Sequence, residues 1–215
     1  MPDNKEPSVE KIGKSRLEAL SDGIFAFAMT LLVISLAVPD IPEKDAPYML
    51  PGEIAKMYPE FLFFIIAFFI LAGYWMSHHK ILEHVRYVDI LLVRINILLL
   101  FFIVLIPFTT SLSGDYSNVL EAVLFFHVNL LVASLMLTAM WWYIRRHSAT
   151  LAPEMRSTEK RGIEKAVVMP GVIMLAIGVS FVNTHASMWC YALIPFILFM
   201  SGRIRWLEGR RMRDS

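Results

Sequence analysis

Residues 16–38 read RLEALSDGIFAFAMTLLVISLAV, a polar opening that runs directly into an apolar stretch. A helix needs about 20 mostly apolar residues to cross a hydrocarbon core about 30 Å thick. The apolar stretch therefore predicts a membrane span from about residue 18 to residue 38. Polar residues are costly inside a membrane helix, so the opening from Arg16 to Gly23 needs an explanation of its own.

Five further segments of the 215-residue chain have the same length and apolar character. Over the whole chain 57% of the residues are hydrophobic, more than a soluble domain of this length normally contains. The sequence therefore predicts an all-α integral membrane protein with six transmembrane helices per protomer. The expected spans are 18–38, 59–77, 89–112, 119–144, 166–184 and 187–205.

Basic residues distinguish the two sides of the membrane. Eighteen of the 20 Lys and Arg residues lie before the first span, in or beside every second connection, or after the last span. Lys44 and Lys56 lie on the opposite side. By the positive-inside rule, both termini are cytoplasmic, and an even number of spans agrees with that arrangement.

The segments outside the spans are expected to hold little regular structure. Residues 1–15 are charged and expected to be flexible, and 208–215 form a basic tail, so one membrane domain covers 16–207. The outer connection from residue 39 to residue 59 holds five prolines and is expected to be an irregular loop. The cytoplasmic connection 145–165 is either a short amphipathic helix on the membrane surface or a plain charged loop.

Several classes of membrane protein lack support. There is no Walker A loop, no helix with Arg or Lys at every third position and no carbonyl filter sequence of ordinary potassium channels. A cluster of His78, His79, Glu83 and His84 invites a metal site. No second cluster exists elsewhere, so a charged loop is the preferred interpretation, and neither a metal site nor a catalytic residue is predicted.

The residues of the first helix separate onto different faces. At about 100° per residue, Leu31 and Ile34 fall close to Phe27, and Thr30 lies on the same side. Asp22 points about 140° away from Phe27. If the Phe27 face lines a pore, Asp22 is therefore directed toward neighbouring helices.

A carboxylate in that position needs hydrogen-bond donors at the same depth. Spans two and three supply polar residues at the cytoplasmic side, where span two ends with Trp75 and His78 and Asn96 lies about two turns into span three. The alternative is that Asp22 and His78 are interfacial and solvated. We predict an intramembrane hydrogen-bond network near the cytoplasmic mouth that contains Arg16, Ser21, Asp22, His78 and Asn96.

The run Arg16-x-x-x-Leu20-Ser21-Asp22-Gly23 resembles the first-helix signature of the transmembrane protein 175 family, which reads Arg, three residues, then Phe-Ser-Asp. Trp75-x-x-His78, and Asn96 followed by Pro107-Phe108, are also similar to the family pattern. Its members are potassium-permeable channels, lysosomal in animals and also present in bacteria and archaea. The resemblance adds Trp75 to the predicted polar network.

The resemblance implies a homotetramer in which the first helices line a central pore. It places an apolar constriction at Phe27, Leu31 and Ile34, with Thr30 as a possible polar ring and K⁺ as the permeant ion. It implies no enzyme activity, no cofactor and no nucleic-acid partner; the expected partners are other copies of the chain and membrane lipid, in the plasma membrane of a prokaryote. Leu20 replaces the usual Phe, and Phe27 replaces a smaller residue, so four Phe rings would narrow or close the constriction.

Two other functions stay open. A secondary transporter of a small solute or proton-coupled ion is one, although no internal repeat is evident. A membrane enzyme that uses His78, His79 and His84 is the other. His127, in the fourth span, is either a pH-sensitive group or an interhelical hydrogen-bond donor.

Overall fold

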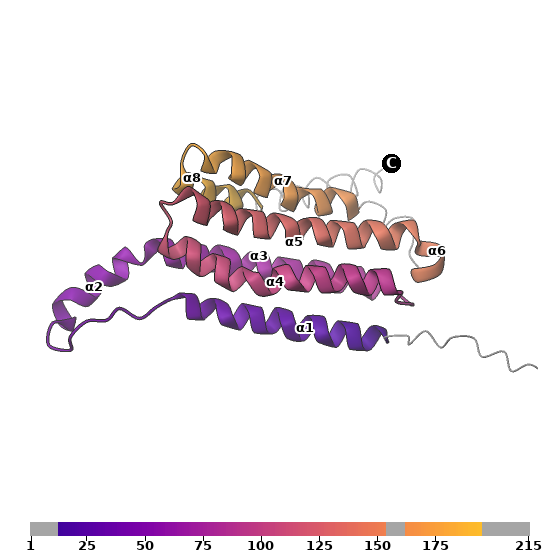
Figure 1. The fold of residues 1–215 in the computed structure, drawn as a ribbon, viewed down its shortest axis with the longest axis horizontal. Coiled ribbons are helices and arrows are strands. Elements are labelled where there is room, and N and C mark those ends of the chain that lie inside the picture. The colour runs from indigo at the N-terminus through magenta and orange to yellow at the C-terminus, as the bar shows by residue number, and fades with distance from the viewer. Residues whose placement is uncertain (1–12, 154–161, 195–215) are drawn as a thin grey trace, which may run out of the picture.

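Long antiparallel helices form the protein in the computed structural model, which describes residues 13–153 and 162–194. Four segments are long and apolar enough to cross a membrane: α1 (Lys14–Leu31) with the 3₁₀ helix η1 (Leu32–Ser35), α3 (Tyr58–Glu83), α4 (Ile90–Asp115) and α5 (Leu120–Arg146). They lie side by side in Figure 1. The expectation of an all-α, multi-pass membrane protein is confirmed.

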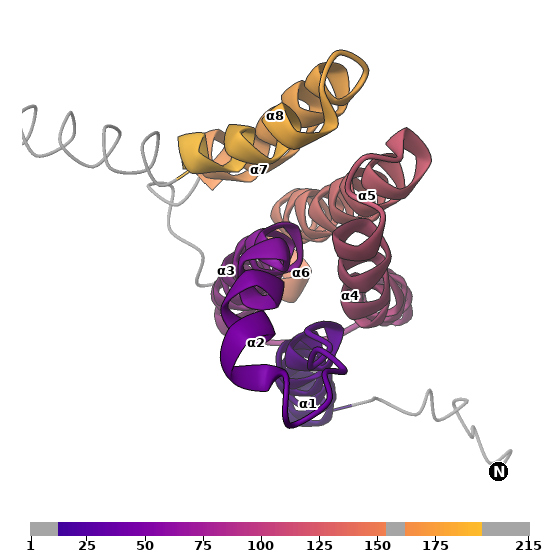
Figure 2. The same cartoon turned by 90° about the vertical axis from the view of Figure 1, so that its left-hand side faces the viewer.

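The last helices of the described structure pack on one side of this bundle. Helix α7 (Gly162–Ser180) lies against α5, and α8 (Thr184–Trp189) and η3 (Cys190–Ala192) turn back along it. The end-on view in Figure 2 places α7 and α8 at one edge and α1 at the opposite edge. Most of the expected sixth span, 187–205, lies outside the described residues.

Helix α1 stands at the edge because it packs mainly against α3 and α4. It begins at Lys14, and beyond Leu31 it tightens into η1 and then becomes extended at Leu36. The first span is therefore shorter at its C-terminal end than the expected 18–38. A run of apolar residues continues to Val38, and composition alone does not mark this change of backbone.

The outer connection contains an 11-residue helix, α2 (Ala46–Lys56), and the expectation of an irregular loop was wrong. Pro47 lies in its first turn, where a backbone N–H has no helical partner to lose. Pro51 lies inside the helix. Proline content was therefore a poor guide, because one of these prolines occupies a position that favours helix initiation.

Helix α3 continues through Glu83, so His78, His79 and Glu83 lie on a helix and not in the expected charged loop. The turn after α3 is tied to the connection after α5, which begins with the short helix α6 (Ser148–Leu151). There the Leu151 carbonyl accepts hydrogen bonds from the backbone N–H groups of Arg86 (2.7 Å) and Tyr87 (3.3 Å). Residues 154–161 of that connection lie outside the described structure.

Candidate functional site

The two faces of α1 have opposite environments. Leu17, Ser21, Phe25 and Ala28 recur at helical spacing and are buried. On the other face the side chains of Phe27 and Ile34 are 63% and 72% exposed within one protomer. Helix α1 is thus anchored along one side and presents an apolar surface along the other.

All four residues that the sequence placed at the constriction belong to this outward side or its border. Phe27, Thr30 and Ile34 are exposed, and Leu31 is half-buried. Leu31 and Ile34 lie three residues apart where the helix becomes 3₁₀, a geometry that stacks positions i and i+3 directly. The Thr30 hydroxyl donates to the Phe27 carbonyl at 2.8 Å, so its proton is used within the helix.

The buried face of α1 is joined to α3 and α4 by a chain of hydrogen bonds. The Asn96 side-chain amide donates to Ser21 Oγ at 3.0 Å, and Ser21 Oγ donates to the Leu17 carbonyl at 2.8 Å. His78 Nε2 lies 2.7 Å from Asn96 Oδ1. Because an amide oxygen only accepts, His78 carries its proton on Nε2. Ser21, His78 and Asn96 are each at most 1% exposed, so this chain crosses a dry interface between three helices.

Asp22 and Trp75 form a separate pair. The Trp75 indole N–H donates to Asp22 Oδ1 at 2.9 Å, and the indole stacks on the His79 ring with centroids 6.0 Å apart. Asp22 itself is exposed in the protomer. The structure therefore brings Asp22 to Trp75, one helix position away from the Ser21 chain but not within it.

Arg16 belongs to neither group. Its side chain is exposed and makes no hydrogen bond or ion pair with any residue that the structure describes. On the helical wheel Arg16 falls about 20° from Phe27, on the outward face, whereas Ser21 falls about 120° away. The same wheel that separated Asp22 from the apolar face would have separated Arg16 from Ser21.

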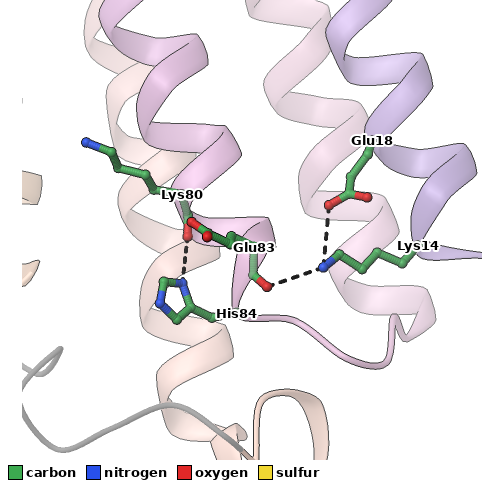
Figure 3. Close-up of polar contacts among 5 residues, drawn as sticks. All are labelled: Lys14, Glu18, Lys80, Glu83 and His84. Carbon is green, nitrogen blue, oxygen red and sulfur yellow. Dashed lines mark hydrogen bonds and ion pairs between the residues drawn. The ribbon is translucent and has the colours of Figure 1, made fainter.

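A different basic residue ties α1 to the C-terminal end of α3. Lys14 Nζ pairs with Glu18 at 3.5 Å and donates to the Glu83 carbonyl oxygen at 3.3 Å (Figure 3). The Lys14 and Glu18 side chains are both partly exposed, and ion pairs near the surface contribute little to stability. Lys14 is therefore a peripheral tether of α1, outside the buried chain.

The histidines at the end of α3 point in different directions. His78 faces Asn96, His79 stacks on Trp75, and His84 Nδ1 donates to the Lys80 carbonyl, 2.8 Å away (Figure 3). Within the described residues no three His, Cys, Asp or Glu side chains are grouped so that they could hold a metal ion. Helical geometry separates this cluster, although its members are adjacent in sequence.

Sequence reasoning missed the partners of His127. Its Nδ1 lies 2.7 Å from the Tyr191 hydroxyl and its Nε2 lies 3.0 Å from Ser187 Oγ. Ser187 Oγ donates its single proton to the Thr184 carbonyl, so His127 Nε2 donates to Ser187 and Tyr191 donates to Nδ1. His127 is thus a satisfied interhelical group between α5 and α8–η3. Ser187 and Tyr191 lie in an apolar segment with no spacing that points to His127.

Comparisons with known proteins show that the segment containing these helix contacts is similar in sequence to ion channels. A family model described as the endosomal/lysosomal potassium channel TMEM175 matches residues 16–107. A potassium channel of Streptomyces collinus is 27% identical over 190 residues, covering 83% of this chain and 88% of the relative. The human endosomal/lysosomal proton channel TMEM175 is 29% identical over 154 residues, covering 67% of this chain and 31% of the human protein.

The fold agrees as well. The crystal structure of a lysosomal potassium-selective channel TMEM175 homologue from Chamaesiphon minutus superposes with a TM-score of 0.73 at 26% identity, covering 87% of this chain and 97% of that one. The family match begins at Arg16 and ends at Pro107, so it contains every residue of the Ser21 chain, the Asp22–Trp75 pair and the outward face of α1. The chain is therefore similar to the TMEM175 family over the segment that carries these contacts.

Proposed function

We propose that the protein is a potassium-permeable cation channel, and that four copies surround a central pore lined by α1. The observation that carries this proposal is the apolar face of α1, where Phe27 and Ile34 are largely exposed within one protomer. One helix cannot enclose a pore, so symmetric copies have to complete the lumen. Because the family is one of ion channels, a histidine-dependent enzyme is not proposed.

The proposed topology has six spans and two cytoplasmic termini in the plasma membrane of a prokaryote. The distribution of Lys and Arg supports it, since Lys14, Lys80, Arg86, Arg145 and Arg146 gather at one end of the described bundle. The guanidinium groups of Arg145 and Arg146 lie over the rings of Trp141 and Trp142, at 5.2 and 5.6 Å from their centroids. Such basic and aromatic pairs suit the headgroup level on the cytoplasmic side.

The pore would select by dehydration. Phe27, Leu31 and Ile34 offer no oxygen to an ion, so each cation crosses this ring with part of its hydration shell removed, and K⁺ loses water at lower cost than Na⁺. Thr30 offers hydroxyl oxygens between these levels; its proton is held by the Phe27 carbonyl, which leaves the oxygen lone pairs for a cation. A narrow apolar ring also closes by dewetting, which supplies a gate.

The buried chain would act as a positioning device. Ser21, Asn96 and His78 fix the rotation of α1 about its axis, and that rotation decides which side chains face outward. A polar group that is buried in the wrong rotation would lose its partner at a cost of about 1–3 kcal/mol. The polar residues therefore hold the pore face without contacting the ion.

Bilayer recordings with K⁺ on one side and Na⁺ on the other test this proposal. Ile34→Asn should raise the Na⁺ permeability relative to K⁺ several-fold, because an amide replaces lost water around either cation. Val33→Asn is the matched control, since Val33 is also exposed, at 57%, and lies beside Ile34 on a different face. Unchanged selectivity after polar substitution at Phe27, Thr30, Leu31 and Ile34 alike would reject the pore assignment. Saturable, coupled flux without electrodiffusive current would instead favour a transporter.

A further inference from the structure

Helix α2 has no buried residue, although it is apolar over much of its surface. Tyr48 is 88% exposed, and Met49, Leu50 and Ile54 are exposed as well. An isolated helix of this length is marginal in water, and helices of proteins normally gain their stability by packing an apolar face. Its described neighbour is the start of α3, which it contacts only lightly. Helix α2 therefore presents an apolar surface that the described residues of one protomer leave uncovered.

The position of α2 argues against lipid as the cover. In Figure 1 it projects past the outer ends of α1 and α4, away from the apolar parts of the bundle that a membrane would surround. Residues 40–56 carry four acidic and two basic side chains. Helices that lie on a membrane surface are usually rich in Lys and Arg, so this charge balance is wrong for lipid attachment.

Its location favours another copy of the chain. The end-on view of Figure 2 shows α2 on the α1 side of the bundle, opposite α7 and α8. Exposed apolar residues continue from Ile34 of η1 through Val38, 88% exposed, to Tyr48 of α2. Copies that meet through α1 would therefore bring their α2 helices together just outside the same pore.

We propose that α2 packs against a neighbouring copy of the chain and, with its symmetry mates, forms a collar around the outer mouth of the pore. Tyr48 is the anchor of this contact, in keeping with the large aromatic residues that dominate protein interfaces. The inference rests on the proposed tetrameric channel. The collar also brings the carboxylates of Asp40, Glu43 and Asp45 near the entrance, where negative charge raises the local cation concentration.

Single-cysteine proteins reconstituted in liposomes test the collar. Cys190 is first replaced by Ala, and Tyr48→Cys is compared with Val182→Cys, whose native side chain is 89% exposed at the turn between α7 and α8. We expect a short bis-maleimide to link Tyr48→Cys protomers into covalent dimers and to leave Val182→Cys protomers unlinked. We also expect a water-soluble maleimide to label Tyr48→Cys at least several-fold more slowly than Val182→Cys. After denaturation in SDS the two variants should be labelled at equal rates.

Three outcomes would overturn the collar. The first is labelling of Tyr48→Cys as fast as of Val182→Cys. The second is slow labelling without dimers, which would indicate a lipid cover. The third is dimers from both variants alike. K⁺ current is recorded from the same liposomes. Protein that conducts K⁺ but shows neither slow labelling nor dimers of Tyr48→Cys would reject the collar alone. Protein that carries no K⁺ current would reject the proposed function.

Discussion

The two sides of α1 differ in burial and in polarity. On the inward side, Ser21 sits at 0% exposure within a chain of hydrogen bonds that reaches two other helices. On the outward side, Phe27 and Ile34 are apolar and largely exposed within one protomer. Changes on the inward side are costly because its buried polar groups cannot replace a lost partner with a hydrogen bond to water. In the proposed channel, the chemistry of the outward side decides which ions pass.

The largest expected effect comes from Asn96, the centre of the inward chain. Asn96→Leu leaves the buried His78 N–H without an acceptor and should lower the free energy of unfolding by about 1–3 kcal/mol. The measurement is the thermal midpoint of the purified protein in detergent. Leu98→Ala, which truncates a side chain that is 47% exposed on the same helix, is the control and should shift the midpoint much less.

A double substitution sharpens that result. His78→Leu combined with Asn96→Leu removes both polar partners, so the pair should recover part of the loss seen in the single variant. Purely additive losses would mean that the His78–Asn96 hydrogen bond does not hold the interface.

A smaller effect is expected from the exposed pair. Asp22→Asn keeps an oxygen that accepts from the Trp75 indole but turns a charge-assisted hydrogen bond into a neutral one. Asp22→Ala removes the acceptor. We expect Asn to cost less than about 1 kcal/mol and Ala to cost more, by the same thermal measurement. Equal losses in the two variants would indicate that the charge of Asp22, and not its hydrogen bond to Trp75, matters.

The smallest effect is expected at Arg16. Its side chain is exposed and makes no hydrogen bond or ion pair with a described residue, so Arg16→Ala should change the stability of the protein by no more than about 0.5 kcal/mol. A thermal midpoint as low as that of Asn96→Leu would place Arg16 in the network after all, through a neighbouring copy.

The sequence was most informative where one physical requirement dominates. Span length and charge bias predicted the membrane helices, because a hydrocarbon core admits few alternatives. The wheel separated Phe27 from Asp22, and depth matching brought Ser21, His78 and Asn96 together. Those steps needed only helix geometry and the cost of burying polar groups.

The remaining features depend on information that a local pattern does not contain. The end of α1 at η1 follows no change in apolar character, and α2 is a helix although Pro51 lies inside it. The partners of His127 come from a segment 60 residues away, where only the tertiary packing selects Ser187 and Tyr191. These are long-range effects, in which the packing of distant segments overrides or supplements local propensity.

The central claim is that the Phe27–Ile34 face of α1 meets the permeating ion, and thiol block of K⁺ current tests it most directly. In a Cys190→Ala background, Ile34→Cys and Val33→Cys channels are exposed to a membrane-impermeant, charged thiol reagent during recording. We expect the reagent to block K⁺ current through Ile34→Cys and to leave Val33→Cys current nearly unchanged. Block at Val33→Cys with no block at Ile34→Cys would contradict the account, because it would turn the opposite side of η1 toward the ion.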